Sequence, residues 1–140
     1  MVSQEVPNME CFVAIVTTHP LVLHVSLHNP LTVATSIYVP RSLKPLGAFM
    51  QVKVRDSKGA IVYETQLPKF APKLEISHKA SYVAIDPGYS YGVLLECETA
   101  QLPTGEYRVE VSYSNLQFRG FPGNFIGDQK CHSSITVTVE

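Results

Sequence analysis

The sequence has no tryptophan, few charged residues and only short apolar runs. The lack of tryptophan ranks carbohydrate binding below protein binding as a function. Charged residues make up 16% of the 140 residues, and the formal net charge is −1. The chain therefore lacks both the basic surface typical of nucleic-acid-binding proteins and an acidic tail. No apolar run is long enough to span a bilayer. We expect neither nucleic acid nor a membrane as a partner.

Cysteine is also scarce, with three residues at irregular spacing: Cys11, Cys97 and Cys131. An odd number without any Cys-x-x-Cys pair is not a disulfide framework, and it predicts no zinc or redox motif. Cys11 and Cys97 lie in apolar, strand-like patterns and are expected to be buried thiols. Cys131 follows a glycine-rich segment and is expected to be exposed. The alternative is one disulfide with one leftover thiol, and the redox state of the cysteines stays open.

The first ten residues have no basic start followed by an apolar stretch, so they do not form a secretory signal. No Asn-x-Ser/Thr glycosylation site occurs in the sequence. Both observations favour a cytoplasmic protein, although a mature or excised domain of a secreted protein has the same features. Hydrophobic residues make up 45% of the chain, which is typical of a globular protein. Residues 1–140 are expected to form a single domain.

Strand-like segments separated by turn residues recur along the chain, and no segment has the periodicity of a helix. Their spacing allows about eight short strands. Hairpins and one longer crossover over residues 66–79 predict an antiparallel Greek key in two packed sheets. The predicted fold class is therefore an all-β, immunoglobulin-like antiparallel sandwich, with a closed barrel as the main alternative. The segments with strand character are residues 12–17, 21–28, 32–39, 49–55, 61–65, 81–85, 89–98, 102–113 and 133–139.

The segment 102–113 carries the strongest fold signal. It begins with a turn, Leu-Pro-Thr-Gly, and continues as a strand in which Tyr107 and Val109 share one face while Arg108 and Glu110 share the other. A tyrosine at this position is what a sandwich corner uses to tie a loop to its sheet. We expect Tyr107 to be such a corner residue and not a site residue.

The sequence offers little material for catalysis or metal binding. His24 and His28 share one face of the predicted strand 21–28, but about 13 Å would separate them, too far for one metal ion. Neither a His-Glu-x-x-His motif nor a Gly-x-Ser-x-Gly motif occurs. Cys131 and His132 are neighbours on a predicted strand, so their side chains point to opposite faces. We expect no catalytic residue, no metal site, no cofactor and no enzymatic activity.

The segment 115–132 is the strongest candidate for function because it is long for a loop in a compact domain. It contains three phenylalanines, Phe118, Phe121 and Phe125, together with Arg119. Aromatic residues and arginine dominate binding hot spots, so these four residues predict an anchor surface for a partner protein. The alternative is that the phenylalanines fold back and plug one end of the sandwich. Asn29 and Pro30 are expected to lie beside this loop and to join the partner-binding surface.

Four motifs in sequence order resemble a known pattern of turns and alternation. They are residues 25–30 (VSLHNP), 49–64 (FMQVKVRDSKGAIVYE), 85–88 (IDPG) and 102–107 (LPTGEY). The pattern is similar to that of the immunoglobulin-like intracellular proteinase inhibitors of bacilli and of the β-domain that precedes the catalytic domain in deuterolysin-type metallopeptidases. The resemblance covers roughly residues 21–113. It implies an immunoglobulin-like sandwich and proteinase inhibition as a role.

Residues 29–32 (NPLT) also resemble the Asn-Pro-Thr-Thr-Gly loop of chagasin-type cysteine-protease inhibitors, although Leu31, Thr32 and Val33 stand where that loop has Thr-Thr-Gly. The leading hypothesis is a non-catalytic protein-binding module that uses loops at one end of the sandwich. The alternatives are a proteinase inhibitor that acts through an exposed loop and a structural subunit that pairs with its own copies. The sequence leaves the oligomeric state open.

Overall fold

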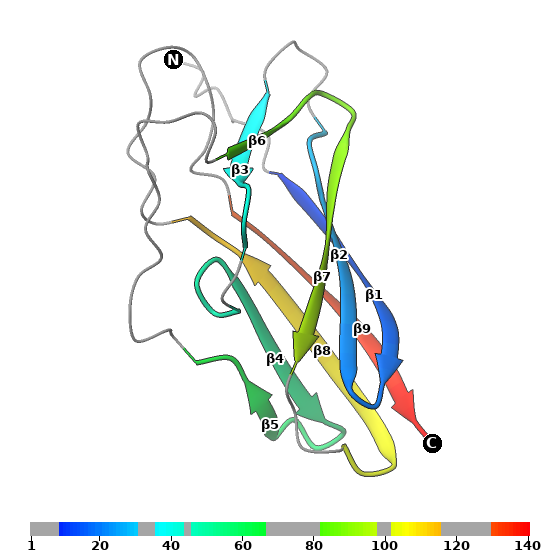
Figure 1. Ribbon diagram of the computed structural model, residues 1–140. Helices are drawn as coiled ribbons and strands as arrows, with labels where there is room; N and C mark the ends of the chain where they lie inside the picture. The colour runs from blue at the N-terminus through cyan, green and yellow to red at the C-terminus, as the bar shows by residue number, and fades with distance from the viewer. Residues whose placement is uncertain (1–8, 31–35, 44–45, 67–81, 98–101, 116–129) are drawn as a thin grey trace, which may run out of the picture.

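The computed structural model describes residues 9–30, 36–43, 46–66, 82–97, 102–115 and 130–140, and within these ranges the chain is all-β and antiparallel (Figure 1). The described part contains no helix, so nothing in it forms a helix that could cross a membrane. The strands are β1 (Glu10–Thr18), β2 (Leu21–His28), β3 (Ile37–Pro40), β4 (Met50–Asp56), β5 (Ile61–Glu64), β6 (Tyr82–Ile85), β7 (Ser90–Cys97), β8 (Gly105–Tyr113) and β9 (Cys131–Val139).

The nine described strands form three antiparallel sheets. The order is β1-β2-β7 in the first, β3-β6 in the second and β5-β4-β8-β9 in the third. Because no sheet returns to its own first strand, the strands do not form a closed barrel, and that alternative is wrong. The strand boundaries differ from the predicted ones by a few residues. For example, β9 begins at Cys131 and not at residue 133.

Alternation along the strands explains the core. In β2 the residues Leu21, Leu23, Val25 and Leu27 are fully buried, and their neighbours are half-buried. The same period of two appears in β4 and β8, as expected for strands with one face on a core. The inward residues of the two larger sheets join one hydrophobic cluster. Each such side chain contributes about 1.5–3 kcal/mol by leaving water.

The β4–β5 hairpin closes through Asp56 and Gly59. The Asp56 carboxylate oxygen Oδ1 accepts hydrogen bonds from the backbone N–H groups of Lys58 and Ala60, each 2.9 Å long. Gly59 has a φ of 84°, in the left-handed region that favours glycine. This turn was predicted from the sequence Asp-Ser-Lys-Gly and is confirmed.

The first and last strands lie side by side, although they belong to different sheets (Figure 1). Residue Cys11 of β1 pairs with Leu27 of β2, and Cys131 of β9 pairs with Tyr113 of β8. The Cys11 and Cys131 thiols are in hydrogen-bonding contact across the seam between the two sheets. This contact places the start of β1, the end of β2, the end of β8 and the start of β9 at one end of the molecule.

Candidate functional site

Asn29 follows β2 at this end of the molecule and is hydrogen-bonded to backbone groups of the β6–β7 connection. Its side chain is completely buried, and the amide Nδ2 donates a 2.8 Å hydrogen bond to the carbonyl oxygen of Ile85. Its backbone N–H donates to the carbonyl of Tyr89, and its own carbonyl accepts from the N–H of Gly88. Asn29 therefore connects the end of β2 to the β6–β7 turn, and its side chain is not exposed on the surface. Pro30, the next residue, is half-buried.

The turn that Asn29 holds is formed by Asp86, Pro87, Gly88 and Tyr89. The N–H of Tyr89 donates to the carbonyl of Asp86 across 3.0 Å, which closes the turn. Gly88 has a φ of 83°, as the third position of a type II turn requires, and proline at the second position fits the same turn type. The turn predicted from Asp-Pro-Gly is confirmed, and the hydrogen bonds between Asn29 and the residues Gly88 and Tyr89 fix its geometry.

This fixed turn presents an aromatic side chain to solvent. Tyr89 is 69% exposed, the largest exposed fraction among the large hydrophobic residues of the described ranges. The next residue, Ser90, has its hydroxyl oxygen 2.8 Å from Nδ1 of His28. His28 in turn lies beside Phe12, with ring centroids 6.3 Å apart and ring planes tilted by 57°. Phe12 is itself 55% exposed.

Phe12, His28, Tyr89 and Ser90 together are called the aromatic corner below. Strands β1, β2 and β7 and the β6–β7 turn supply it, so its backbone is held by sheet hydrogen bonds and by Asn29. Sequence analysis missed the corner. The signal that could have found it is the outward position of Phe12 on β1, next to a β2 face that carries His28.

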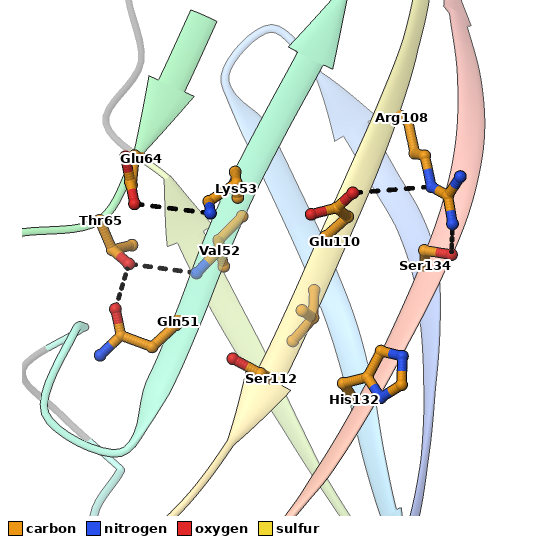
Figure 2. Close-up of a pocket in the computed structure, with 11 residues that line it drawn as sticks. Gln51, Val52, Lys53, Glu64, Thr65, Arg108, Glu110, Ser112, His132 and Ser134 are labelled. Carbon is orange, nitrogen blue, oxygen red and sulfur yellow. Dashed lines mark hydrogen bonds and ion pairs between the residues drawn. The ribbon is translucent and has the colours of Figure 1, made fainter. Parts of the chain in front are cut away.

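The outer face of the four-stranded sheet holds a second candidate, a polar groove of about 480 Å³ (Figure 2). Its floor consists of cross-strand rows on β4, β8 and β9. Lys53 lies opposite Glu110, and Glu110 lies opposite Ser134. In the next row Ser112 lies between Gln51 and His132. Most of the side chains that line the groove carry hydrogen-bond donors or acceptors, and Val52 and Val111 add apolar surface.

The charges of this groove are already paired with one another. Lys53 Nζ lies 3.7 Å from a Glu64 carboxylate oxygen. The Glu110 oxygen Oε1 lies 3.4 Å from Arg55 Nε and 3.7 Å from Arg108 Nε. Each of these side chains is about one-third exposed or more, so each pair stabilises the sheet by no more than about 1 kcal/mol. The predicted alternation of Arg108 and Glu110 on the outer face is confirmed.

Ser112 and His132 are a serine and a histidine that lie directly opposite each other in the groove. Among the described residues, no hydrogen bond joins them and no carboxylate orients the imidazole. Nucleophilic catalysis needs such a chain of contacts. The arrangement can therefore bind a polar ligand through hydrogen bonds, but the described side chains do not assemble an activated nucleophile.

His24 and His28 occupy the same face of β2, opposite Leu94 and Ser90 respectively. No group of three or more metal-ligating side chains is found within the described ranges.

The cysteines lie largely as predicted. Cys11 and Cys97 are buried, and Cys131 is partly exposed. Burial raises the pKa of the Cys97 thiol to about 11. Cys131 and His132 are adjacent in β9, so their side chains point to opposite faces, as expected.

The other predicted site residues, Phe118, Arg119, Phe121 and Phe125, lie outside the described residues. Their segment leaves β8 at Tyr113 and enters β9 at Cys131. These two residues are register partners at the end of the molecule where Asn29 lies. A comparison with known proteins places the chain in no family, because no family model, curated protein or solved structure matches it.

Proposed function

We propose that the chain is an immunoglobulin-like sandwich and that it serves as a non-catalytic protein-binding module. The strand orders support the fold. The order β1-β2-β7 corresponds to strands A-B-E of immunoglobulin-type domains, and β5-β4-β8-β9 corresponds to C′-C-F-G. With these assignments, β7 returns to lie beside β2, and β8 returns to lie beside β4. Together with the hairpins, these returns make Greek-key connections.

Tyr107 supports the same fold. Its hydroxyl donates a 2.6 Å hydrogen bond to the carbonyl of Pro103, four residues upstream, at the start of β8. A tyrosine at the start of strand F that bonds back in this way is the tyrosine corner of immunoglobulin-type sandwiches. Strand β8 is strand F in the assignment above, so the bond and the strand order agree.

The observation that carries the binding role is the exposure of Tyr89 on a turn that Asn29 holds rigid. A large aromatic side chain at this exposure has little packing to lose if it is replaced. Tyrosine is nevertheless enriched at binding hot spots, because it offers contact area with only two rotatable bonds to immobilise. A rigid backbone reduces the entropy lost on binding still further. We infer that the aromatic corner contacts a partner protein.

The segment 116–129 belongs to the same proposal. Its anchors, Tyr113 and Cys131, lie at the end of the molecule that carries Asn29 and Tyr89. Loops that share one end of such a sandwich form the binding surface of antibody variable domains. Phe118, Arg119, Phe121 and Phe125 are proposed to extend the aromatic corner. Asn29 contributes by shaping the turn.

Partner capture with matched variants tests this role. The chain is immobilised as wild type, as Tyr89→Ala and as Val62→Ala, and bound proteins are quantified by mass spectrometry. Val62 is 45% exposed on β5, in the other large sheet, and serves as the control. A partner of the aromatic corner is retained by Val62→Ala and lost with Tyr89→Ala. If no captured protein depends on Tyr89, the aromatic corner is not the binding site.

The identity of the captured protein separates the remaining roles. A proteinase that depends on Tyr89, and whose activity the chain blocks, would make the module an inhibitor. Capture of the chain by itself would make it a self-associating subunit, and light scattering over a range of concentrations measures that directly.

A further inference from the structure

Cys11 and Cys131 meet at the seam between the two large sheets. Cys11 lies on β1, at the edge of one sheet, and Cys131 is the first residue of β9, at the edge of the other. No backbone ladder joins these two edges in the described chain, so their neighbouring side chains hold the seam. A side-chain hydrogen bond joins the two thiols, and both cysteines line the same hollow.

The same place is open to small molecules. A hollow of about 740 Å³ is lined by both cysteines together with Phe12, Tyr113 and His132. Cys131 is partly exposed at this hollow, and Cys11 is 7% exposed. A small oxidant can therefore reach the pair through the hollow without unfolding the chain.

The contact also divides the chemical roles between the two thiols. The hydrogen bond that Cys11 accepts from Cys131 lowers the pKa of Cys11 against the opposing effect of burial. The same bond and burial raise the pKa of Cys131. Cys11 is thus the sulfur that more readily becomes the thiolate, which is the nucleophile in thiol oxidation.

We propose that Cys11 and Cys131 are a modification site at which a peroxide oxidises the pair to an intrachain disulfide that joins β1 to β9. The Cys11 thiolate attacks one peroxide oxygen, the O–O bond breaks, and Cys11 becomes a sulfenic acid while hydroxide leaves. The Cys131 sulfur then attacks the Cys11 sulfur, the S–O bond breaks, and the leaving hydroxide takes the Cys131 proton to form water. The hydroxide of the first step takes up the proton that Cys11 lost when it became a thiolate. Two thiols lose two electrons in total, and hydrogen peroxide is reduced to two molecules of water.

Cys97 is the internal control for this chemistry. It is 1% exposed, and it pairs with Leu21 at the opposite end of β2 from Leu27, the partner of Cys11. Burial raises the pKa of Cys97 to about 11, so it remains a protonated thiol at neutral pH. The disulfide is therefore expected to exclude Cys97 and to leave one free thiol.

The experiment uses the full chain, fully reduced and then exposed to hydrogen peroxide. Free thiols are counted after denaturation, and disulfide-linked peptides are identified without reduction. The wild type is expected to lose two of its three thiols, and Cys97→Ala is expected to lose both of its remaining thiols. The linked peptides should contain Cys11 and Cys131 in both proteins. Oxidation should also raise the melting temperature of both, and a thiol reductant should reverse the rise.

Single variants test the order of the steps. In Cys131→Ser the Cys11 sulfenic acid has no partner and should accumulate as an adduct of a sulfenic-acid trap such as dimedone, whereas Cys11→Ser should give no such adduct. A linked peptide that contains Cys97, a disulfide only between two chains, or a wild type that keeps all three thiols would overturn the proposal. The wild type and Cys97→Ala decide it even if either single variant fails to fold. The test does not depend on the proposed protein-binding role.

Discussion

The hydroxyl of Tyr107 donates a hydrogen bond to the carbonyl oxygen of Pro103 across 2.6 Å, and this bond ties the turn before β8 to the core. Tyr107→Phe removes the bond while keeping the ring. We expect the free energy of unfolding to fall by about 1 kcal/mol, because a net intramolecular hydrogen bond is worth roughly that amount. Chemical denaturation of the two proteins measures the difference.

Tyr113→Phe, on the same strand and the same face, is the matched control. In the described part of the chain the buried Tyr113 hydroxyl has no hydrogen-bond partner. Removing it is expected to leave stability unchanged or to raise it, since an unpaired buried polar group is costly. Equal losses of unfolding free energy in both variants would show that the bond from Tyr107 to Pro103 does not stabilise the turn before β8.

Asn29→Asp tests the connection between β2 and the β6–β7 turn. A carboxylate at this buried position would face the Ile85 carbonyl without a proton to donate, so we expect a loss of about 3 kcal/mol at neutral pH. The folded-state pKa of the new carboxyl would lie above its unfolded value of about 3.9. Its penalty is therefore expected to shrink as the pH falls toward that value, where the protonated acid can donate to Ile85. Asn29→Ala has no titrating group, and its loss relative to wild type should not depend on pH. A pH-independent loss in Asn29→Asp would contradict the buried geometry.

Because its Cys97 thiol is buried, the protein is expected to lose stability at high pH. Burial raises the pKa of its thiol from 9.0 to about 11 in the folded protein. Between these values the unfolded chain loses the proton and the folded chain keeps it, so the stability contribution is full below pH 9 and falls as the pH rises toward 11. The difference between wild type and Cys97→Ala in reducing buffer should therefore shift by up to about 2–3 kcal/mol across this window. A constant difference from pH 8 to 11 would mean that Cys97 is not buried.

The two faces of β8 should respond differently to mutation. Glu110 pairs with Arg55 and Arg108 on the exposed groove, so Glu110→Gln is expected to cost less than about 1 kcal/mol and to cost less still in high salt. Val109, the preceding residue, is completely buried, and Val109→Ala should cost about 2 kcal/mol at any ionic strength. Thermal melts in low and high salt compare the two variants.

Local patterns were enough to predict the strands, the turns at Gly59 and Gly88, and the tie between Tyr107 and the turn before β8, because period-two alternation and turn chemistry act over a few residues. The burial of Asn29 was not predicted. Its burial depends on the carbonyl of Ile85, 56 residues away, and a single sequence does not show that contact. The meeting of Cys11 and Cys131 depends likewise on the order of two sheets. Tyr89 was predicted only as the start of a strand, because exposure follows from the fold and not from the local sequence.

Crosslinking from the position of Tyr89 tests the binding role most directly. A photoreactive phenylalanine analogue replaces Tyr89 in one protein and Val62 in a second, and both are irradiated with the partner that wild type captures. We expect a covalent adduct from position 89 and none from position 62. Tyr89→Ala should weaken binding of the same partner by roughly 30-fold, the effect of losing a hot-spot side chain worth about 2 kcal/mol. An adduct from position 62 alone, together with unchanged affinity in Tyr89→Ala, would contradict the proposal that the aromatic corner binds the partner.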